Sequence, residues 1–141
     1  MSNGSDQFDF WLGRWDLTWG EDGSGVNRIE RIMEGAVILE NFEVGDPALK
    51  GMSLSVFSKE DNRWHQTWVD NSGSYLDFAG DFKDGRMTLT RDGMVQGQRV
   101  RQRMVWFEIT ENALEWNWER SDDEGGTWKV LWNIHYRRHS S

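Results

Sequence analysis

Three polar side chains alternate with apolar residues and are therefore candidates for contacts with a small molecule. Glu40, Gln66 and Gln102 each have apolar residues two positions before and after them, so a strand that turns its apolar face inward also buries these three. A buried polar group without a partner costs about 1–3 kcal/mol. Each must therefore bond to a ligand, to buried water, to one another, or to Tyr136 or Arg138. In an otherwise apolar pocket they would supply the polar contacts of a ligand.

The ten tryptophans are the second feature that bears on binding. An indole ring can stack on a flat aromatic molecule, and its N–H can donate a hydrogen bond. Six tryptophans have the right position for this, namely Trp15, Trp68, Trp106, Trp116, Trp118 and Trp132. We expect Trp68, Trp106, Trp116 and Trp132 to contact the ligand. The alternative is that these large side chains simply fill the interior of a barrel.

Catalysis has much weaker support in the sequence. Glu40 and Asp70 could act as an acid/base pair, as in an isomerase or a decarboxylase, but no nucleophile or metal cluster accompanies them. The chain has no cysteine, which excludes disulfides, thiolate metal sites and a cysteine nucleophile. We therefore predict no catalytic residue, no metal ligand and no cofactor.

The charge of the chain bears on its partners. The 24 acidic and 16 basic side chains give a net charge of −8, which repels nucleic acids and anionic membranes. The basic strip from Gln98 to Arg103 is expected to be an outward strand face that meets acidic residues. Residues Met1 to Asp9 lack a basic region followed by an apolar run. We expect a soluble cytoplasmic protein whose partner is a small apolar or aromatic molecule, and a homodimer is compatible with the sequence.

The elements that must position these residues are strands. Runs rich in Val, Ile, Thr and aromatic residues alternate apolar with polar side chains and are separated by turn sequences such as Asp84-Gly85 and Asp92-Gly93, the pattern of half-buried strands. The expected strands lie near 13–19, 26–33, 36–44, 51–58, 63–70, 74–82, 86–91, 97–109, 113–120 and 127–138. A helical turn is expected at 5–12. Residues 1–141 are predicted to form one all-β domain, a single antiparallel up-and-down barrel of about ten strands.

Turn chemistry predicts the register of three hairpins. Asp84-Gly85 is typical of a two-residue type I′ turn. Residues 71–73 and 110–112 are typical of three-residue loops, with Gly73 and Asn112 in the left-handed conformation. The predicted pairs are Phe82–Met87, Gly80–Leu89, Trp68–Leu76, Gln66–Phe78, Trp106–Trp116 and Met104–Trp118 on the apolar face and Arg103–Glu119 on the other. A two-residue loop at 111–112 would instead oppose Arg103 to Arg120, which is destabilising.

The segment Ser121 to Trp128 resembles the Asp-box, the S-x-D-x-G-x-T-W hairpin of sialidase propeller blades. The resemblance implies a structural turn in which Asp123 accepts backbone N–H groups and Trp128 packs beneath it. A propeller requires several copies, whereas this chain has one. The spacing of an EF-hand calcium loop is missing.

Gly13-Arg14-Trp15, together with Tyr136-Arg137-Arg138, resembles the termini of the calycin barrels, the lipocalins and their relatives. The resemblance implies that Trp15 packs against an arginine of the last strand, so that Trp15, Tyr136 and Arg138 close the barrel. A wider pattern runs from Phe10 through the segment at 64–70 to Arg138 and is similar to a bacterial family of small lipocalin-like domains of unassigned function. It implies a fold and little chemistry.

Two subfamilies of calycins fit the sequence poorly. Fatty-acid-binding proteins place two helices between the first two strands, whereas only Gly20 to Gly25 are available here. Haem-binding members of the nitrobindin type use a histidine near the carboxyl end. His135 has that position, but its strand parity predicts that it faces outward, and His65 shares the polar face of its own strand. Haem at His135 therefore remains only an alternative.

The sequence favours a binding module that holds a mostly apolar, aromatic molecule in a tryptophan-rich cavity. Two alternatives stay open: a barrel enzyme that uses Glu40 or Asp70, and a filled barrel that serves as an interaction domain.

Overall fold

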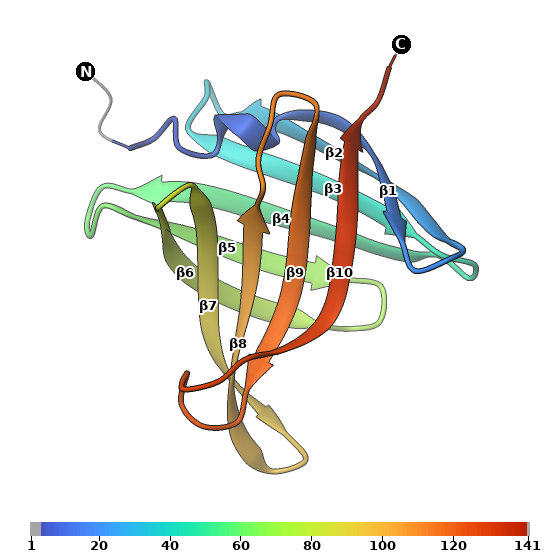
Figure 1. Cartoon of the computed structure of the whole chain (residues 1–141). Coiled ribbons are helices and arrows are strands. Elements are labelled where there is room, and N and C mark those ends of the chain that lie inside the picture. The colour runs from blue at the N-terminus through green and yellow to red at the C-terminus, as the bar shows by residue number, and fades with distance from the viewer. Residues whose placement is uncertain (1–3, 141) are drawn as a thin grey trace.

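Ten antiparallel strands form one closed barrel in the computed structural model, which describes residues 4–140. Each strand pairs with its neighbours along the chain, and the last pairs with the first (Figure 1). The strands are β1 (Gly13–Trp19), β2 (Gly23–Ile32), β3 (Val37–Val44), β4 (Leu49–Ser58), β5 (Arg63–Asp70), β6 (Tyr75–Lys83), β7 (Arg86–Val95), β8 (Gln98–Phe107), β9 (Ala113–Ser121) and β10 (Lys129–Arg138). Across 4–140 no helix has the length and apolar character needed to cross a membrane. The predicted all-β barrel is confirmed.

The three predicted registers are confirmed. Phe82 pairs with Met87, Trp68 with Leu76, and Trp106 with Trp116. Between β6 and β7, Asp84 and Gly85 have φ of 55° and 77°, the positive values that a type I′ turn requires at both central positions. The apolar side chains of these hairpins consequently share the interior of the barrel.

Two turn predictions are wrong in detail. Asp92-Gly93 lies inside β7, which continues to Val95. A side chain at Gly93 would collide with Arg91 and Gln102, so this glycine leaves space for a neighbour instead of turning the chain. After β8, the left-handed residue is Glu108, with φ of 48°, and not Asn112. The register is unaffected: β8 and β9 pair from Phe107–Glu115 onward, and this pairing opposes Arg103 to Glu119 as predicted.

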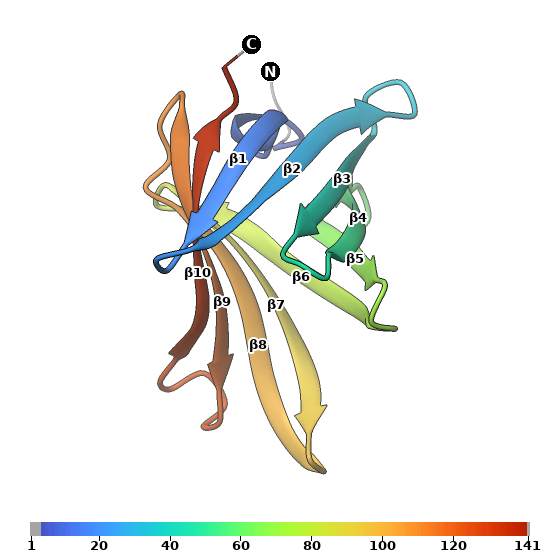
Figure 2. The same cartoon turned by 90° about the vertical axis from the view of Figure 1, so that its right-hand side faces the viewer.

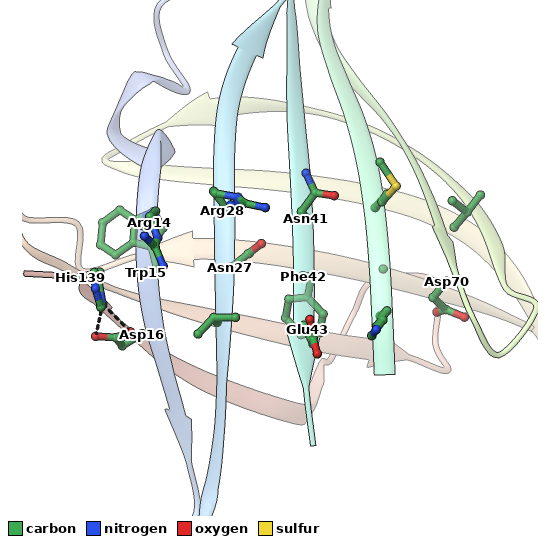
Figure 3. Close-up of a pocket in the computed structure, with 15 residues that line it drawn as sticks. Arg14, Trp15, Asp16, Asn27, Arg28, Asn41, Phe42, Glu43, Asp70 and His139 are labelled. Carbon is green, nitrogen blue, oxygen red and sulfur yellow. Dashed lines mark hydrogen bonds and ion pairs between the residues drawn. The ribbon is translucent and has the colours of Figure 1, made fainter. Parts of the chain in front are cut away.

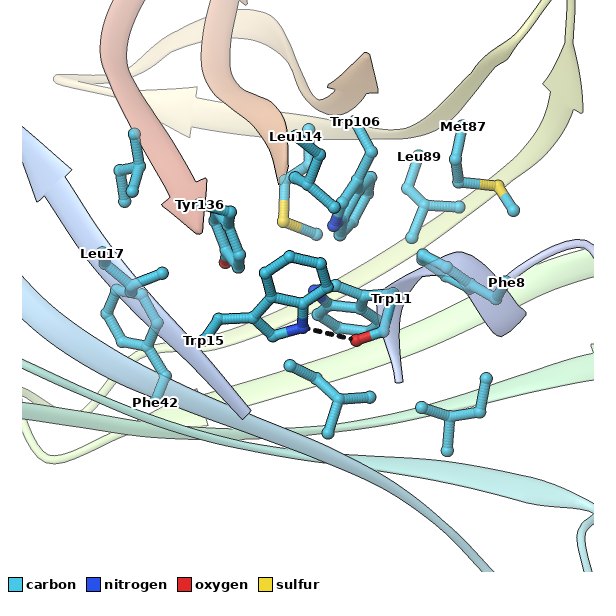
Figure 4. Packing of buried hydrophobic residues seen from close by; sticks show 14 of the residues in the cluster. Phe8, Trp11, Trp15, Leu17, Phe42, Met87, Leu89, Trp106, Leu114 and Tyr136 are labelled. Carbon is cyan, nitrogen blue, oxygen red and sulfur yellow. Dashed lines mark hydrogen bonds between the residues drawn. The ribbon is translucent and has the colours of Figure 1, made fainter. Parts of the chain in front are cut away.

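The amino-terminal segment fills one end of the barrel. Successive i to i+3 backbone hydrogen bonds run through residues 4–12 and include the 3₁₀ turn η1 (Asp9–Trp11). Phe8 and Trp11 are fully buried. Their rings stack at 4.7 Å, and Phe8 meets the Trp106 ring edge-on at 5.0 Å (Figure 4). This end of the barrel is therefore packed with aromatic rings.

The barrel closes between β1 and β10 through side chains of both strands. The guanidinium carbon of Arg138 lies 4.2 Å from the centre of the Trp15 ring. Arg138 also donates hydrogen bonds to the carbonyl oxygens of Leu12, at 2.8 Å, and Glu111, at 3.0 Å. Tyr136 is buried and meets Trp15 edge-on at 5.8 Å. One arginine thus joins the last strand, the first strand and the amino-terminal segment.

The opposite end of the barrel is wider. The register of β6 with β7 runs only from Ala79–Thr90 to Lys83–Arg86, whereas β7 pairs with β8 as far as Val95–Gln98. Beyond the paired part the two strands diverge (Figure 2). The barrel is consequently filled at one end and flared at the other.

The outward faces carry the predicted ion pairs and the predicted acidic turn. Arg103 contacts Glu119 at 2.7 Å, and its guanidinium carbon lies 3.9 Å from the Trp128 ring centre. In the turn from Ser121 to Trp128, the carboxylate of Asp123 accepts hydrogen bonds from the Thr127 backbone N–H, at 2.8 Å, and from the Thr127 hydroxyl, at 2.7 Å. The arginine strip and the Asp-box-like turn are therefore surface features of the sheet.

Candidate functional site

A cavity of about 250 Å³ lies inside the barrel, on the flared side of the aromatic plug that Phe8 and Trp11 form at the other end. Six aromatic residues form most of its wall: Phe42, Trp68, Phe78, Trp116, Trp118 and Trp132. Trp106 lines the cavity and also contacts Phe8 of the plug. The polar residues of the wall are Glu40, Asp70, Ser74 and Tyr136. The cavity is therefore apolar and aromatic, with a small number of polar groups.

The aromatic rings of the wall meet edge to face. Phe42 lies 5.6 Å from Trp68 and 6.1 Å from Trp132, with interplanar angles of 73° and 86°. Trp116 and Trp132 are 5.9 Å apart at 84°. Such T-shaped pairs place the positive edge of one ring against the negative face of the next. The rings thus hold each other in fixed orientations around the cavity.

A glycine on the neighbouring strand makes room for the Trp68 ring. Gly51 of β4 lies beside β5, and a Cβ atom at this position would overlap the six-membered ring of Trp68. The Trp68 indole N–H donates a 2.9 Å hydrogen bond to Asp70. Gly51 and Asp70 together determine how this ring lies in the wall of the barrel.

Glu40 is the buried carboxyl group of the site. It lies on β3 and is only 6% exposed. Its two oxygens accept hydrogen bonds from the Ser53 hydroxyl of β4, at 2.7 Å, and from the Asn27 amide of β2, at 2.8 Å. Burial raises the pKa of Glu40 to about 7, and the bonds from Ser53 and Asn27 oppose this rise. Near neutral pH, Glu40 can therefore both give and accept a proton.

Tyr136 extends the same network across the barrel. Asn27 donates its second amide hydrogen to the Tyr136 hydroxyl at 2.9 Å. Burial, and secondarily the charge of Glu40, raises the pKa of Tyr136 well above its usual range, so the phenol keeps its proton and remains a hydrogen-bond donor. Glu40, Asn27 and Tyr136 form one connected polar group in the wall.

Asp70 differs from Glu40 in its protonation. It accepts hydrogen bonds from the Ser72 hydroxyl, at 2.6 Å, from the Ser72 backbone N–H, at 3.0 Å, and from Trp68. Partial burial tends to raise its pKa, but these hydrogen bonds outweigh that effect and lower the pKa. Asp70 is therefore a carboxylate at neutral pH.

The residues predicted from the sequence divide into two groups. Glu40, Trp68, Trp106, Trp116 and Trp132 all line the cavity. Gln66 and Gln102 are not among its lining residues: Gln66 donates to Ser55 at 2.9 Å, and Gln102 accepts a hydrogen bond from Arg91. Their partners are thus Ser55 and Arg91, which differ from the partners expected above, and the buried carbonyl oxygen of Gln66 has no hydrogen-bond partner within the described residues.

Sequence reasoning missed the partners of Glu40. Neither Asn27 nor Ser53 was predicted as a site residue, whereas Tyr136 was predicted to close the barrel and was named as a possible partner of the buried polar groups. Strand parity could have identified Asn27 and Ser53, because each lies on the inward-facing side of its strand. Their contact with Glu40 depends on the relative register of β2, β3 and β4, and no register was predicted for these strands.

A second, larger depression of about 540 Å³ lies on the outer surface of β1 to β5 (Figure 3). It is bordered by side chains of both charges, including Arg14, Arg28 and Glu43. His139 contacts Asp16 at its edge at 3.1 Å. The mixed charges and the exposure of these side chains do not define one ligand chemistry, so we consider the inner cavity the better candidate site.

The histidines that could bear on a cofactor lie on the outside of the barrel. His65 contacts Asp61 at 2.8 Å, and His135 contacts Glu115. Neither histidine lines the inner cavity. Within residues 4–140, no three or more His, Cys, Asp or Glu side chains gather in a group that could hold a metal ion.

No protein-family model matches the chain, and no curated protein matches it. The function of the chain is therefore inferred from the site itself.

Proposed function

We propose that this protein binds a small, mostly apolar, aromatic molecule in the inner cavity of its barrel. The observation that carries the proposal is the composition of the cavity wall, in which aromatic rings surround a few convergent polar groups. Ligand sites usually have this composition, with volumes of roughly 300–1,000 Å³. A volume of about 250 Å³ favours a molecule of one or two rings.

The arrangement suggests how such a molecule would be held. Burying its apolar surface against Trp116, Trp132 and Phe42 supplies a hydrophobic contribution that grows with the area removed from water. The T-shaped packing of these rings fixes the wall before binding, which limits the ordering cost of association. Glu40 and Tyr136 would then orient the polar end of the molecule.

The termini also support a structural relation to the calycin barrels, which we propose as the evolutionary setting of this binding site. The supporting observation is the contact of Arg138 with the Trp15 ring next to Gly13. A calycin relation agrees with ligand binding inside the barrel but assigns no ligand.

Quenching of tryptophan fluorescence by 4-nitrobenzyl alcohol tests the binding proposal. This neutral probe is flat, and its nitro group quenches indole emission on contact. We expect saturable quenching in the wild type and an affinity at least fivefold lower in Trp116→Leu, which removes part of the cavity wall. Trp128→Leu is the matched control, because Trp128 lies outside under Arg103. Linear quenching that matches free N-acetyltryptophanamide would contradict the proposal.

An acid/base enzyme is the second candidate, and one observation favours it. Glu40 and Asp70 line the same cavity, and their environments move their pKa values in opposite directions. Pairs of titratable groups whose environments shift their pKa values apart are typical of acid/base sites. Glu40 would transfer the proton while Asp70 stays ionised.

A proton-abstraction probe tests this second candidate. In 5-nitrobenzisoxazole, removal of the proton at C3 breaks the N–O bond and releases a coloured cyanophenolate, so a base in an apolar cavity accelerates the reaction. An active Glu40 predicts a rate that rises through about pH 7 and falls to background in Glu40→Gln. Equal rates for the wild type and this variant would exclude Glu40 as a base for this probe.

A further inference from the structure

The ionisable groups that line the inner cavity are all acids. They are Glu40, Asp70 and Tyr136, and no lysine, arginine or histidine is among the lining residues. Asp70 is ionised, whereas Glu40 lies near the midpoint of its titration at neutral pH. The field inside the cavity is therefore negative or neutral.

The tryptophan rings add to this negative field. The face of an indole carries the negative part of its quadrupole and attracts a cation within about 6 Å. Trp68 approaches the cavity from β5, and Trp116 and Trp132 approach it from the neighbouring strands β9 and β10. Walls of this kind bind quaternary and primary ammonium groups in aromatic cages.

A cation would also stabilise the buried carboxylate of Glu40. Removing a carboxylate from water is costly unless an opposite charge or several hydrogen bonds accompany it. In the described structure, Glu40 has two hydrogen-bond donors, Ser53 and Asn27, and no basic side chain forms an ion pair with it. A cationic ligand would supply the missing opposite charge.

Two arginines lie farther along the inward-facing sides of β7 and β9, beyond the cavity wall. Arg91 is bound to Gln102, and Arg120 contacts Asp122 at 2.8 Å. Arg91 lies two residues after the inward-facing Leu89, and Arg120 lies two residues after the inward-facing Trp118, so both arginines are on the inward-facing side of their strands. Their positive charges repel a cation and oppose the field of the cavity acids, but neither arginine is among the residues that line the cavity.

From these contacts we infer that the ligand of the inner cavity is an organic cation, whose ammonium group lies between the Glu40 carboxyl and the tryptophan rings. The inference rests on the proposed binding function and adds the charge of the ligand. The aromatic or apolar part of the molecule occupies the remainder of the cavity. The acidic groups that face the ammonium are Glu40 and Asp70, with the neutral phenol of Tyr136 beside them.

Three probes of one shape and different charge test this inference. They are 4-nitrobenzylamine, which is protonated at pH 7.5, the neutral 4-nitrobenzyl alcohol, and the anionic 4-nitrobenzoate. Saturable quenching of tryptophan fluorescence gives each dissociation constant. We expect the ammonium to bind at least tenfold more tightly than the alcohol, and the carboxylate to bind most weakly.

Removing a negative charge at either of two positions of β3 tests whether Glu40 causes the preference for the ammonium probe. Glu40→Gln keeps the shape of the side chain and should lower the affinity for the ammonium at least tenfold more than it lowers the affinity for the alcohol, which meets the same side chain without a charge. Glu43→Gln is the matched control, because it removes the same charge from the exposed face of the same strand. Asp70→Asn is the second variant if Glu40→Gln does not fold, and it should also weaken binding of the ammonium selectively.

The outcomes separate this inference from the proposal on which it rests. Saturable binding of the alcohol with an ammonium affinity no higher than that of the alcohol would overturn the cationic ligand and leave the binding function intact. Saturable binding of none of the three probes would contradict both. Equal ammonium losses in Glu40→Gln and Glu43→Gln would also overturn the inference, because they would indicate attraction by the overall charge of the protein.

Discussion

Ser53 donates a hydrogen bond of 2.7 Å to Oε1 of Glu40 inside the wall of the barrel. Ser53 is 2% exposed and Glu40 is 6% exposed, so an ionisable group with few donors is buried where strands usually place apolar side chains. Such a group reduces stability when it is charged. Proteins often accept this cost at functional sites.

The raised pKa of Glu40 predicts that stability falls as the pH increases. The folded state holds a proton at Glu40 up to about pH 7, whereas the unfolded chain releases it near 4.5. The folded state thus binds more protons in this window, and the free energy of unfolding must decrease from pH 5 to pH 8. The full shift corresponds to a loss of up to about 3 kcal/mol.

Urea denaturation at several pH values measures this loss. Glu40→Gln cannot titrate at this position, so the decrease in its stability between pH 5 and pH 8 should be much smaller than that of the wild type. Glu43→Gln should follow the wild type. Parallel pH profiles for the wild type and Glu40→Gln would show that Glu40 does not titrate in this range.

Arg138 should contribute more to stability than a surface arginine. Arg138→Ala removes the contact with the Trp15 ring and the hydrogen bonds to the carbonyls of Leu12 and Glu111. We expect a loss of roughly 2–4 kcal/mol, because a cation–π contact contributes about 0.5–2 kcal/mol and charged hydrogen bonds contribute about as much.

Arg138→Lys distinguishes the two contributions. It keeps the charge near the ring and loses the planar fork that reaches two carbonyls, so it should retain about half of the stability that Arg138→Ala loses. Guanidinium denaturation followed by tryptophan fluorescence provides the comparison. A loss below about 0.5 kcal/mol in Arg138→Ala, the range of an ordinary surface substitution, would mean that barrel closure does not depend on this residue.

Gly51 should be coupled energetically to Trp68. A Cβ atom at position 51 would overlap the Trp68 ring, so Gly51→Ala should cost roughly 1–3 kcal/mol and should weaken probe binding by moving the ring into the cavity. When Trp68 is also replaced by leucine, the methyl group that Gly51→Ala adds no longer meets the indole ring.

The double variant Gly51→Ala/Trp68→Leu checks this coupling. Its stability should exceed the value expected from adding the two single effects, with an interaction energy of about 1 kcal/mol or more. Additive effects within about 0.3 kcal/mol would indicate that the two residues do not interact.

The carboxylate of Asp123 should hold the turn before β10. Hydrogen bonds from the Thr127 hydroxyl and backbone lower the pKa of Asp123 to about 2. Its stabilising effect is therefore present above about pH 4 and is lost as the pH falls through 2. Asp123→Ala should leave the barrel folded and should accelerate hydrogen exchange of the Thr127 amide at pH 6. Asp122→Ala, one residue earlier, is the control and should leave this amide protected.

The fold could be predicted in large part from the sequence because its signals are local. Period-2 alternation requires only that one face of each strand avoids water, and Asp84-Gly85 requires a particular turn through its backbone preferences. Turn positions were less predictable. Gly93 resembled a turn residue, yet its role is to leave room for Arg91, a contact between side chains that turn propensity does not include.

The candidate site could be predicted only in part. Parity identified Glu40 and four tryptophans as inward-facing, and these residues do line one cavity. Parity alone did not distinguish Glu40 from Gln66, because both face inward. Gln66 meets the hydroxyl of Ser55, whereas Glu40 meets Ser53 and also lines the cavity.

The sequence by itself determined the strands, three hairpin registers and the inward face of each strand, since these follow from alternation and turn chemistry between near neighbours. Only the tertiary structure decided that the plug of Phe8 and Trp11 fills one end, that a cavity remains at the other, and that Glu40 meets Asn27 and Tyr136 there. The physical reason is that cavity volume and pKa depend on how side chains from distant strands pack together. Closing the barrel pairs β1 with both β2 and β10, which lets Asn27 of β2 reach Tyr136 of β10.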